Sequence, residues 1–170
     1  LVKPKIDKGE EFKVLITQPK IDPWEAKYGI SKSNLDYFKI FKDLTNEELS
    51  ANEYDFVFTS ETFFSEGYGE NVDYFRFTKL YDSLNNYLSQ FNNTNLISGI
   101  QFYKLYQNQK EKPTKSANPV RDNIWVDYFN SSINMSANKD FEYNHKSKLV
   151  VGSEYMPMKS LLEPIIGTIM

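Results

Sequence analysis

Two charged residues, Glu61 and Lys146, occupy positions from which side chains commonly do chemistry. Glu61 ends an apolar run over residues 54–61 that predicts a buried strand. Residues at strand ends in α/β folds are fixed by backbone pairing, yet they can be reached from the following loop. A carboxylate there can act as a general base if Phe63 and Phe64 bury it and raise its pKa. The other interpretation is a solvent-facing residue beside the loop, and composition alone favours that one.

Lys146 and Lys148 alternate on a stretch with strand character, so their side chains point to opposite faces and only one of them can face a given site. A lysine pair taken alone is usually solvated charge. His145 is the only histidine of the chain and should point away from Lys146, so a Ser-His-Asp triad or a multi-histidine metal site is hard to build. We expect a structural or solvent-facing role for His145, and we expect no metal and no cofactor.

Glu154 follows Gly152 and Ser153 in a predicted loop that Pro157 closes. Glu154 can hydrogen-bond a neighbouring lysine or cap a helix predicted to begin near Met158, and the residues alone leave both roles open. No residue can supply a thiol nucleophile, because the chain contains no cysteine. This composition also excludes disulfides and thiolate metal sites within these residues.

The composition is that of a globular chain of 170 residues, rich in aromatic side chains, with 12 Tyr and 13 Phe. This length lies within the range of one domain. A net charge of −3 and dispersed basic residues give no electrostatic footprint for nucleic-acid binding. No run of about 18 apolar residues is present, so these residues do not cross a bilayer by themselves. Both ends look cut from a longer protein.

Apolar periodicity predicts alternating strands and helices in the first two thirds of the chain. Three short strands are predicted over residues 12–18, 54–61 and 96–103. A first helix, capped by Ser31 or Ser33, has apolar residues at helical spacing, namely Leu35, Phe38, Ile40, Phe41 and Leu44. A second helix carries Phe75, Leu80, Leu84 and Leu88. The βαβαβ order predicts an α/β domain with helices packed on a sheet.

The residue pattern in the last third of the chain predicts an exposed insertion followed by antiparallel strands. Residues 104–123 are polar and contain two prolines, which indicates an exposed insertion. Strand-like runs follow at residues 125–129 and 132–135, and a turn signal at residues 138–140 precedes another run over residues 141–150. A hairpin is therefore expected here.

Four segments together resemble the nitrilase, or carbon-nitrogen hydrolase, superfamily, and within it the catalytic domain of the apolipoprotein N-acyltransferases of Bacteroidetes-like bacteria. Residues 14–23 are similar to the opening strand and the "Q-P-N-I-D-P" turn, and residues 58–62 to the "P-E-T" motif, with Ser60 in place of Pro. Residues 130–132 are similar to the "N-S-A" strand start. The most specific match is that of residues 143–157 to "Y-H-K-S-K-L-V-P-G-x-E-x-M-P", in which Val151 replaces Pro.

This resemblance implies a role for each charged residue. Glu61 corresponds to the general base, Lys146 to the lysine that stabilises the oxyanion, and Glu154 to a second active-site glutamate, while Lys148 falls on a basic or histidine position. The family's nucleophilic cysteine lies downstream of the Pro157 loop. We therefore expect residues 1–170 to form an incomplete catalytic domain of the layered α-β-β-α sandwich type, truncated before the nucleophile and inactive alone.

The implied activity is acyl transfer. The family's cysteine takes an acyl chain from a phospholipid as a thioester and passes it to the α-amine of the lipid-modified N-terminal cysteine of an apolipoprotein. The resemblance thus implies both substrates as partners, flanking membrane segments, and a catalytic domain on the periplasmic side of the inner membrane. Two alternatives stay open, namely a soluble nitrilase-type amidase and a non-catalytic module that kept the fold and lost its nucleophile.

Overall fold

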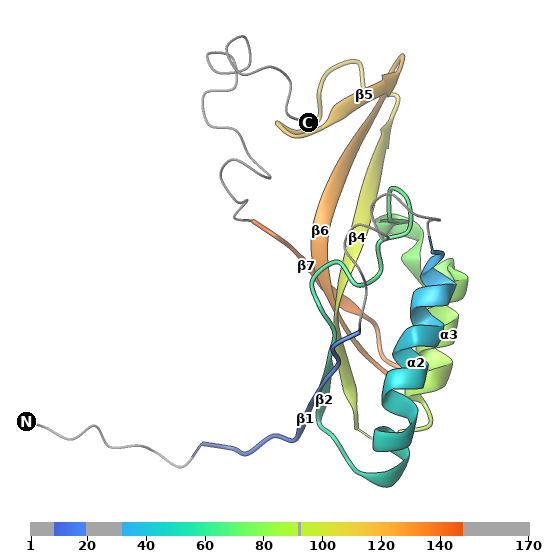
Figure 1. The fold of residues 1–170 in the computed structure, drawn as a ribbon. Helices are drawn as coiled ribbons and strands as arrows, with labels where there is room; N and C mark the ends of the chain where they lie inside the picture. The colour runs from blue at the N-terminus through green and yellow to red at the C-terminus, as the bar shows by residue number, and fades with distance from the viewer. Residues whose placement is uncertain (1–8, 20–31, 92, 148–170) are drawn as a thin grey trace, which may run out of the picture.

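The computed structural model describes residues 9–19, 32–91 and 93–147, which contain a mixed seven-stranded sheet. Strands β1 (Val14–Ile16), β2 (Phe56–Phe58) and β4 (Asn95–Gln107) are parallel, and β6 (Ile124–Ser136) is antiparallel to β4. Helices α2 (Asn34–Ala51) and α3 (Lys79–Leu88) lie side by side over one face of this sheet (Figure 1). The predicted α/β class is confirmed.

A long two-stranded ribbon forms the frame of the sheet. Strands β4 and β6 are each 13 residues long and pair over their whole length, from Asn95 opposite Ser136 to Gln107 opposite Ile124. Shorter strands extend this ribbon on both sides: β3 (Glu70–Asn71) pairs with β4, whereas β5 (Asn118–Arg121) and β7 (Glu142–His145) pair with β6 (Figure 1). The ribbon formed by β4 and β6 therefore fixes the positions of these three shorter strands.

Helix α2 begins at a capping box. The Ser33 hydroxyl accepts the Asp36 N–H at 3.2 Å, and the Asp36 carboxylate accepts the Ser33 N–H at 3.2 Å, which satisfies donors that the helix leaves unpaired. The Ser33 hydrogen bonds, together with one from Lys39, lower the pKa of Asp36 to about 2. The cap fixes where the helix begins, and its buried residues follow at intervals of three or four: Asn34, Tyr37, Phe41, Thr45 and Leu49.

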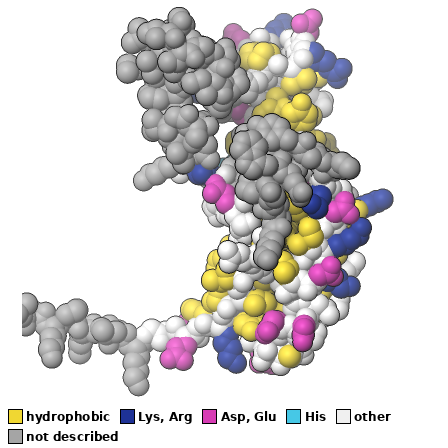
Figure 2. Space-filling view, viewed as in Figure 1, with side chains coloured by type: hydrophobic (Ala, Val, Ile, Leu, Met, Phe, Trp, Pro, Cys, Tyr) yellow, Lys and Arg dark blue, Asp and Glu magenta, His cyan; other side chains and the backbone are white. Residues whose placement is uncertain are grey.

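The hydrophobic core lies between the helices and one face of the β4–β6 ribbon. Side chains alternate along a strand, and Leu96, Ile100 and Phe102 of β4 are fully buried against the helical layer. The intervening residues of β4, such as Tyr103, face away from the helices. On the side seen in Figure 2, acidic and basic side chains of the described residues are interspersed.

The predicted order of strands and helices is confirmed, as is the hairpin, because β7 follows β6 after the turn at residues 138–140. A 3₁₀ helix, η1 (Val72–Phe77), precedes α3, so Phe75, which was predicted to lie in the second helix, lies in η1 instead. The runs at residues 125–129 and 132–135 are one strand, since Asn130 and Ser131 stay paired with β4. The insertion predicted over residues 104–123 is shorter than expected, because β4 continues to Gln107 and residues 118–121 form strand β5.

Two apolar residues of the predicted elements are exposed. The run over residues 12–18 suited a buried strand, but Ile16 of β1 is 74% exposed, and within the described residues β1 pairs with β2 alone. Leu44 is 43% exposed, because α2 buries the stripe that contains Phe41 and Thr45. Local periodicity located both elements but did not determine which face their neighbours cover.

The buried stripe of α2 predicts unequal effects of two substitutions on that helix. Phe41 is fully buried and its ring packs against Tyr87 at 5.7 Å, so Phe41→Ala should lower the free energy of unfolding by about 3–5 kcal/mol. Leu44→Ala, at an exposed position, should change it by about 0.5 kcal/mol or less. Urea unfolding of both variants measures this. Equal losses would mean that α2 buries a different face.

Candidate functional site

Glu61 and Lys146 are in contact, although they are 85 positions apart in the sequence. The Lys146 ammonium donates to Glu61 Oε1 at 2.8 Å. Asn130 Nδ2 donates to the same oxygen at 2.6 Å. One Glu61 oxygen therefore accepts a hydrogen bond from Asn130 on β6 and another from Lys146, the residue that follows β7.

The pairing of β7 with β6 places Lys146 beside Asn130. His145 is opposite Ser131 in the register of these strands, and the Lys146 N–H donates to the Asn130 carbonyl at 2.8 Å. Both side chains then extend toward the loop after β2 and reach Glu61. The backbone of two paired strands, and not a flexible loop, determines the position of the two donors.

The turn that carries Glu61 rests directly on β4. The Phe64 N–H donates to the Gly99 carbonyl at 3.1 Å, and the Thr59 N–H donates to the Ile97 carbonyl at 3.1 Å. A Cβ atom at Gly99 would overlap the Ser60 carbonyl oxygen and the Thr62 nitrogen. Thr62 has a φ of 51°, in the left-handed region that β-branched residues rarely adopt. A glycine on β4 and a strained threonine therefore hold Glu61 at this position.

A pocket of about 420 Å³ surrounds the contact between Glu61 and Lys146. Its walls come from the turn after β2, the first half of β4, the middle of β6 and the end of β7, over residues 59–61, 97–99, 130–132 and 144–146. The Glu61 side chain is 62% exposed and that of Lys146 is 28% exposed. A molecule in this pocket can therefore reach a carboxylate and an ammonium group together.

Glu61 is not buried beside Phe63 and Phe64, so its exposure agrees with the solvent-facing interpretation and not with the buried one. Both phenylalanines are buried in the core under the helices, at 2% and 0% exposure, while the Glu61 carboxylate stays accessible. The chain turns at Thr62, so Phe63 and Phe64 enter the core while the Glu61 side chain remains outside it. Hydrogen bonds from Lys146 and Asn130, and not an apolar enclosure, surround this carboxylate.

His145 has the structural contacts that were expected for it. Its ring stacks on Phe129 with centroids 4.0 Å apart, and its Nδ1 is 2.7 Å from the Ser131 hydroxyl. Burial, and then the nearby Lys104 charge, lower the pKa of His145. Ser131 is only 5% exposed, and no carboxylate among the described residues is hydrogen-bonded to His145. The Ser131–His145 pair thus links β6 to β7, and the described part of the chain supplies no third member of a triad.

Several sequence-based assignments cannot be placed in this site. Glu154, Lys148 and the rest of the segment up to residue 157 lie outside the described residues, as do residues 20–23, so their roles stay predictions. Residues 130–132 do not form a strand start, because they lie in the middle of the continuous strand β6. The sequence pattern assigned Asn130 no catalytic or positioning role, because it lies between the two predicted strand runs and was only part of the "N-S-A" match.

Comparison with known proteins adds no assignment, since no family model matches the chain and no curated protein matches its sequence. Within residues 9–19, 32–91 and 93–147, no group of three or more His, Asp or Glu side chains could hold a metal ion. Neither helix in these ranges has the length and apolar character needed to span a membrane. The geometry of the site and the sequence motifs are therefore the basis for a proposed function.

The contact between the Glu61 turn and β4 predicts that Gly99 cannot carry a side chain. Gly99→Ala should lower the free energy of unfolding by about 1–3 kcal/mol, because a methyl group would push apart two backbone segments. Gly9→Ala is the control, since open space surrounds a Cβ atom at that position. Urea unfolding compares the two variants, and an unchanged midpoint for Gly99→Ala would contradict the observed packing.

The environment of His145 predicts a pH dependence. Its folded pKa lies below the ordinary value of 6.5, so the unfolded chain binds a proton at a higher pH than the folded chain does. The contribution of His145 to stability is complete above pH 6.5 and is lost as the pH falls through the folded pKa. NMR titration of the imidazole should show this lowered pKa, and Lys104→Met should raise it only partway toward 6.5, because burial is the larger cause. A pKa of 6.5 or above in the unaltered protein would refute this assignment.

Proposed function

We propose that this chain supplies the glutamate and the lysine of a nitrilase-type Glu-Lys-Cys site that transfers an acyl group to the N-terminal amine of apolipoproteins. The contact of 2.8 Å between Lys146 and Glu61 carries the proposal. The resemblance assigns these two residues to one site, and 85 positions of sequence separate them. A carboxylate within hydrogen-bonding distance of a lysine is the arrangement that such a site requires.

The architecture supports the same proposal. Helices α2 and α3 cover one face of the sheet (Figure 1), and a layer of helices on one sheet is one half of an α-β-β-α sandwich. The polar pocket opens where residues of four strands or strand ends meet. In this proposal a second sheet and the nucleophile come from sequence outside these residues.

The proposed reaction needs a thiol, which residues 1–170 do not contain. Glu61 takes the proton of that cysteine thiol, and the sulfur attacks the carbonyl carbon of a phospholipid ester. The Lys146 ammonium stabilises the negative charge that forms on the carbonyl oxygen. When the ester C–O bond breaks, Glu61 gives its proton to the departing lysophospholipid alkoxide, and a thioester remains.

The second half of the reaction uses the same groups. The acceptor amine attacks the thioester carbonyl, Lys146 again stabilises the oxyanion, and the C–S bond breaks. Glu61 accepts a proton from the new amide nitrogen and returns it to the thiolate. Asn130 is a positioning residue in this scheme, because its hydrogen bond of 2.6 Å orients the Glu61 carboxylate. Phospholipid, apolipoprotein and an inner-membrane location facing the periplasm belong to this proposal.

The test uses the full gene product that contains these residues, incubated with a phospholipid that has a labelled acyl chain. The unaltered protein should form a hydroxylamine-sensitive acyl thioester and transfer the label to the N-terminal amine of a diacylglyceryl-cysteine peptide. Glu61→Gln and Lys146→Met should each reduce thioester formation about 100-fold or more, since a base or an oxyanion donor contributes factors of this size. Mass spectrometry measures both products.

Matched controls remove the same charges at exposed positions away from the pocket, in Glu47→Gln and Lys139→Met. These variants should keep full activity. Release of free fatty acid without amide formation would indicate that water, and not the amine, accepts the acyl group, and that the protein is a hydrolase instead of a transferase. An unchanged rate in Glu61→Gln, or a protein that never forms a thioester, would refute the proposed chemistry.

A further inference from the structure

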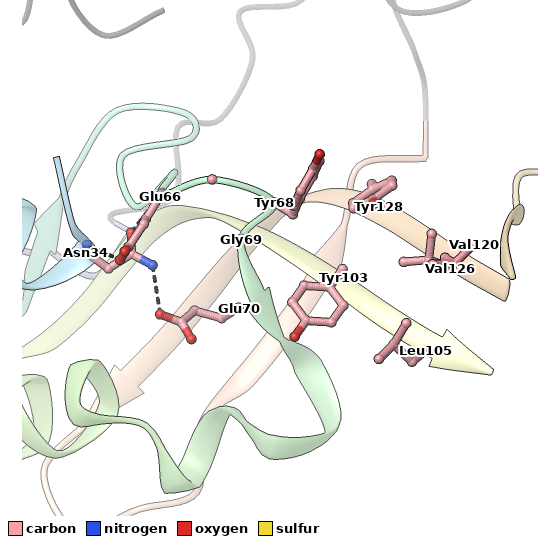
Figure 3. Close-up of a pocket in the computed structure, with 11 residues that line it drawn as sticks. Asn34, Glu66, Tyr68, Gly69, Glu70, Tyr103, Leu105, Val120, Val126 and Tyr128 are labelled. Carbon is pink, nitrogen blue, oxygen red and sulfur yellow. Dashed lines mark hydrogen bonds between the residues drawn. The ribbon is translucent and has the colours of Figure 1, made fainter. Parts of the chain in front are cut away.

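A second pocket, of about 580 Å³, lies beside the loop over residues 66–70 and the far half of the ribbon. Tyr103 is opposite Tyr128, and Leu105 is opposite Val126, in the β4–β6 register. Because side chains alternate along a strand, these four residues share the face that is turned away from the helices. The chemical character of the pocket changes along its length, from acidic through aromatic to aliphatic (Figure 3).

The acidic end is built around a buried asparagine. Asn34 is 2% exposed, and its backbone N–H donates to Glu66 at 2.7 Å while its Nδ2 donates to Glu70 at 2.8 Å. The Glu66 N–H returns a hydrogen bond to the Asn34 side-chain oxygen at 3.1 Å. Figure 3 shows both glutamates beside Asn34 at one end of the pocket. These three hydrogen bonds hold two carboxylates near each other despite their repulsion.

The backbone of this loop has the conformation that brings it onto the sheet. Gly67 and Gly69 have φ values of 55° and 88°, in the left-handed region that glycine adopts without strain. A Cβ atom at Gly69 would overlap the Gln101 carbonyl, so the loop lies directly on β4. The acidic end of the pocket is therefore fixed to the same strand that carries Tyr103.

Aromatic rings form the middle of the pocket. The rings of Tyr68 and Tyr128 have centroids 5.6 Å apart with an interplanar angle of 33°, and Tyr103 lies next to them on β4 (Figure 3). Tyr68 is 74% exposed and Tyr128 is 43% exposed, so ring surface is open to a ligand. The aliphatic end follows, with Leu105, Val120 and Val126.

We propose that this pocket binds an organic cation, namely an ammonium ion attached to an alkyl chain. Two carboxylates attract a positive charge, and the faces of tyrosine rings stabilise a cation that lies within about 6 Å of their centroids. The aliphatic end takes the alkyl chain out of water. None of the lining residues in the described part of the chain is basic, so an anionic head group would meet only negative charge and ring faces.

The pocket is next to the Glu61–Lys146 contact. Tyr128 lies two residues from Asn130 on β6, on the same face and therefore about 7 Å away along the strand. An amine held at the rings is thus close to the carboxylate to which Asn130 is bonded. The identification of this amine with the acyl acceptor rests on the proposed function, whereas binding of an alkylammonium ion does not.

The binding test titrates octyltrimethylammonium, octanol and octanoate into the purified protein and follows heat by calorimetry. The three probes share a chain and differ in charge. The ammonium should bind about 10-fold or more tightly than octanol, octanoate should bind most weakly, and added salt should weaken the ammonium alone. Equal affinity for all three, tighter binding of octanoate, or no ammonium binding at millimolar concentration would overturn the proposal.

Variants locate the binding. Glu66→Gln combined with Glu70→Gln removes the charge but leaves oxygens to accept the Asn34 hydrogen bonds, and it should weaken ammonium binding about 10-fold with little effect on octanol. Tyr128→Ala should also weaken it, whereas Tyr74→Ala, at a tyrosine 65% exposed outside the pocket, should not. Circular dichroism checks that each variant is folded. Ammonium binding that survives in both pocket variants would refute this location.

Two biological molecules carry this chemistry, and competition separates them. A peptide with a free N-terminal S-alkylcysteine should displace octyltrimethylammonium, and its N-acetylated form should not. A short-chain phosphatidylethanolamine should compete more weakly, because its phosphate lies close to the two carboxylates. Displacement by the acetylated peptide would overturn the requirement for a cation. Loss of acyl transfer in Glu61→Gln with ammonium binding intact would test the proposed function separately from this pocket.

Discussion

The antiparallel pairing of β4 with β6 determines where the functional side chains lie. Its register places Asn130 opposite Gln101 and Tyr128 opposite Tyr103, so both pockets form on the face turned away from the helices. A slip of one residue would exchange the two faces of a strand. Ile100 and Phe102 prevent this slip, because both are fully buried under the helices and would become exposed. The hydrophobic core thus fixes the position of polar residues that it does not contact.

The order and type of the main elements followed from the sequence because their signals are local. A helical repeat of apolar residues after a Ser33 cap indicated α2, and β-rich runs between polar turns indicated β2 and β4. The exposure of Leu44 and Ile16 did not follow, since it depends on which neighbour covers each face. The sequence also did not show that β6 continues through Asn130. Pairing with β4 keeps this part of the strand extended, and the apolar pattern of β6 itself gives no signal for it.

The site could be predicted in part. Glu61 and Lys146 were identified from motif positions, and their contact agrees with that pairing. Asn130 was not assigned a role, because its side chain reaches Glu61 only through the combined registers of β4 with β6 and of β6 with β7. The exposure of Glu61 was one of the two interpretations that the sequence left open. It depends on the left-handed conformation of Thr62, and a threonine gives no sequence signal for that conformation.

The turn that carries Glu61 is held by the core and not by its ion pair. An ion pair in which the glutamate is 62% exposed contributes little to folding, because solvent screens it. The same turn holds Thr62 in a strained conformation and requires Gly99 to lack a side chain, both of which cost free energy. The same turn carries Phe63 and Phe64 into the core, where both are buried, and this burial offsets the cost of the strained backbone. The core therefore accounts for the conformation of the turn, and the exposed contact between Glu61 and Lys146 is a consequence of that conformation.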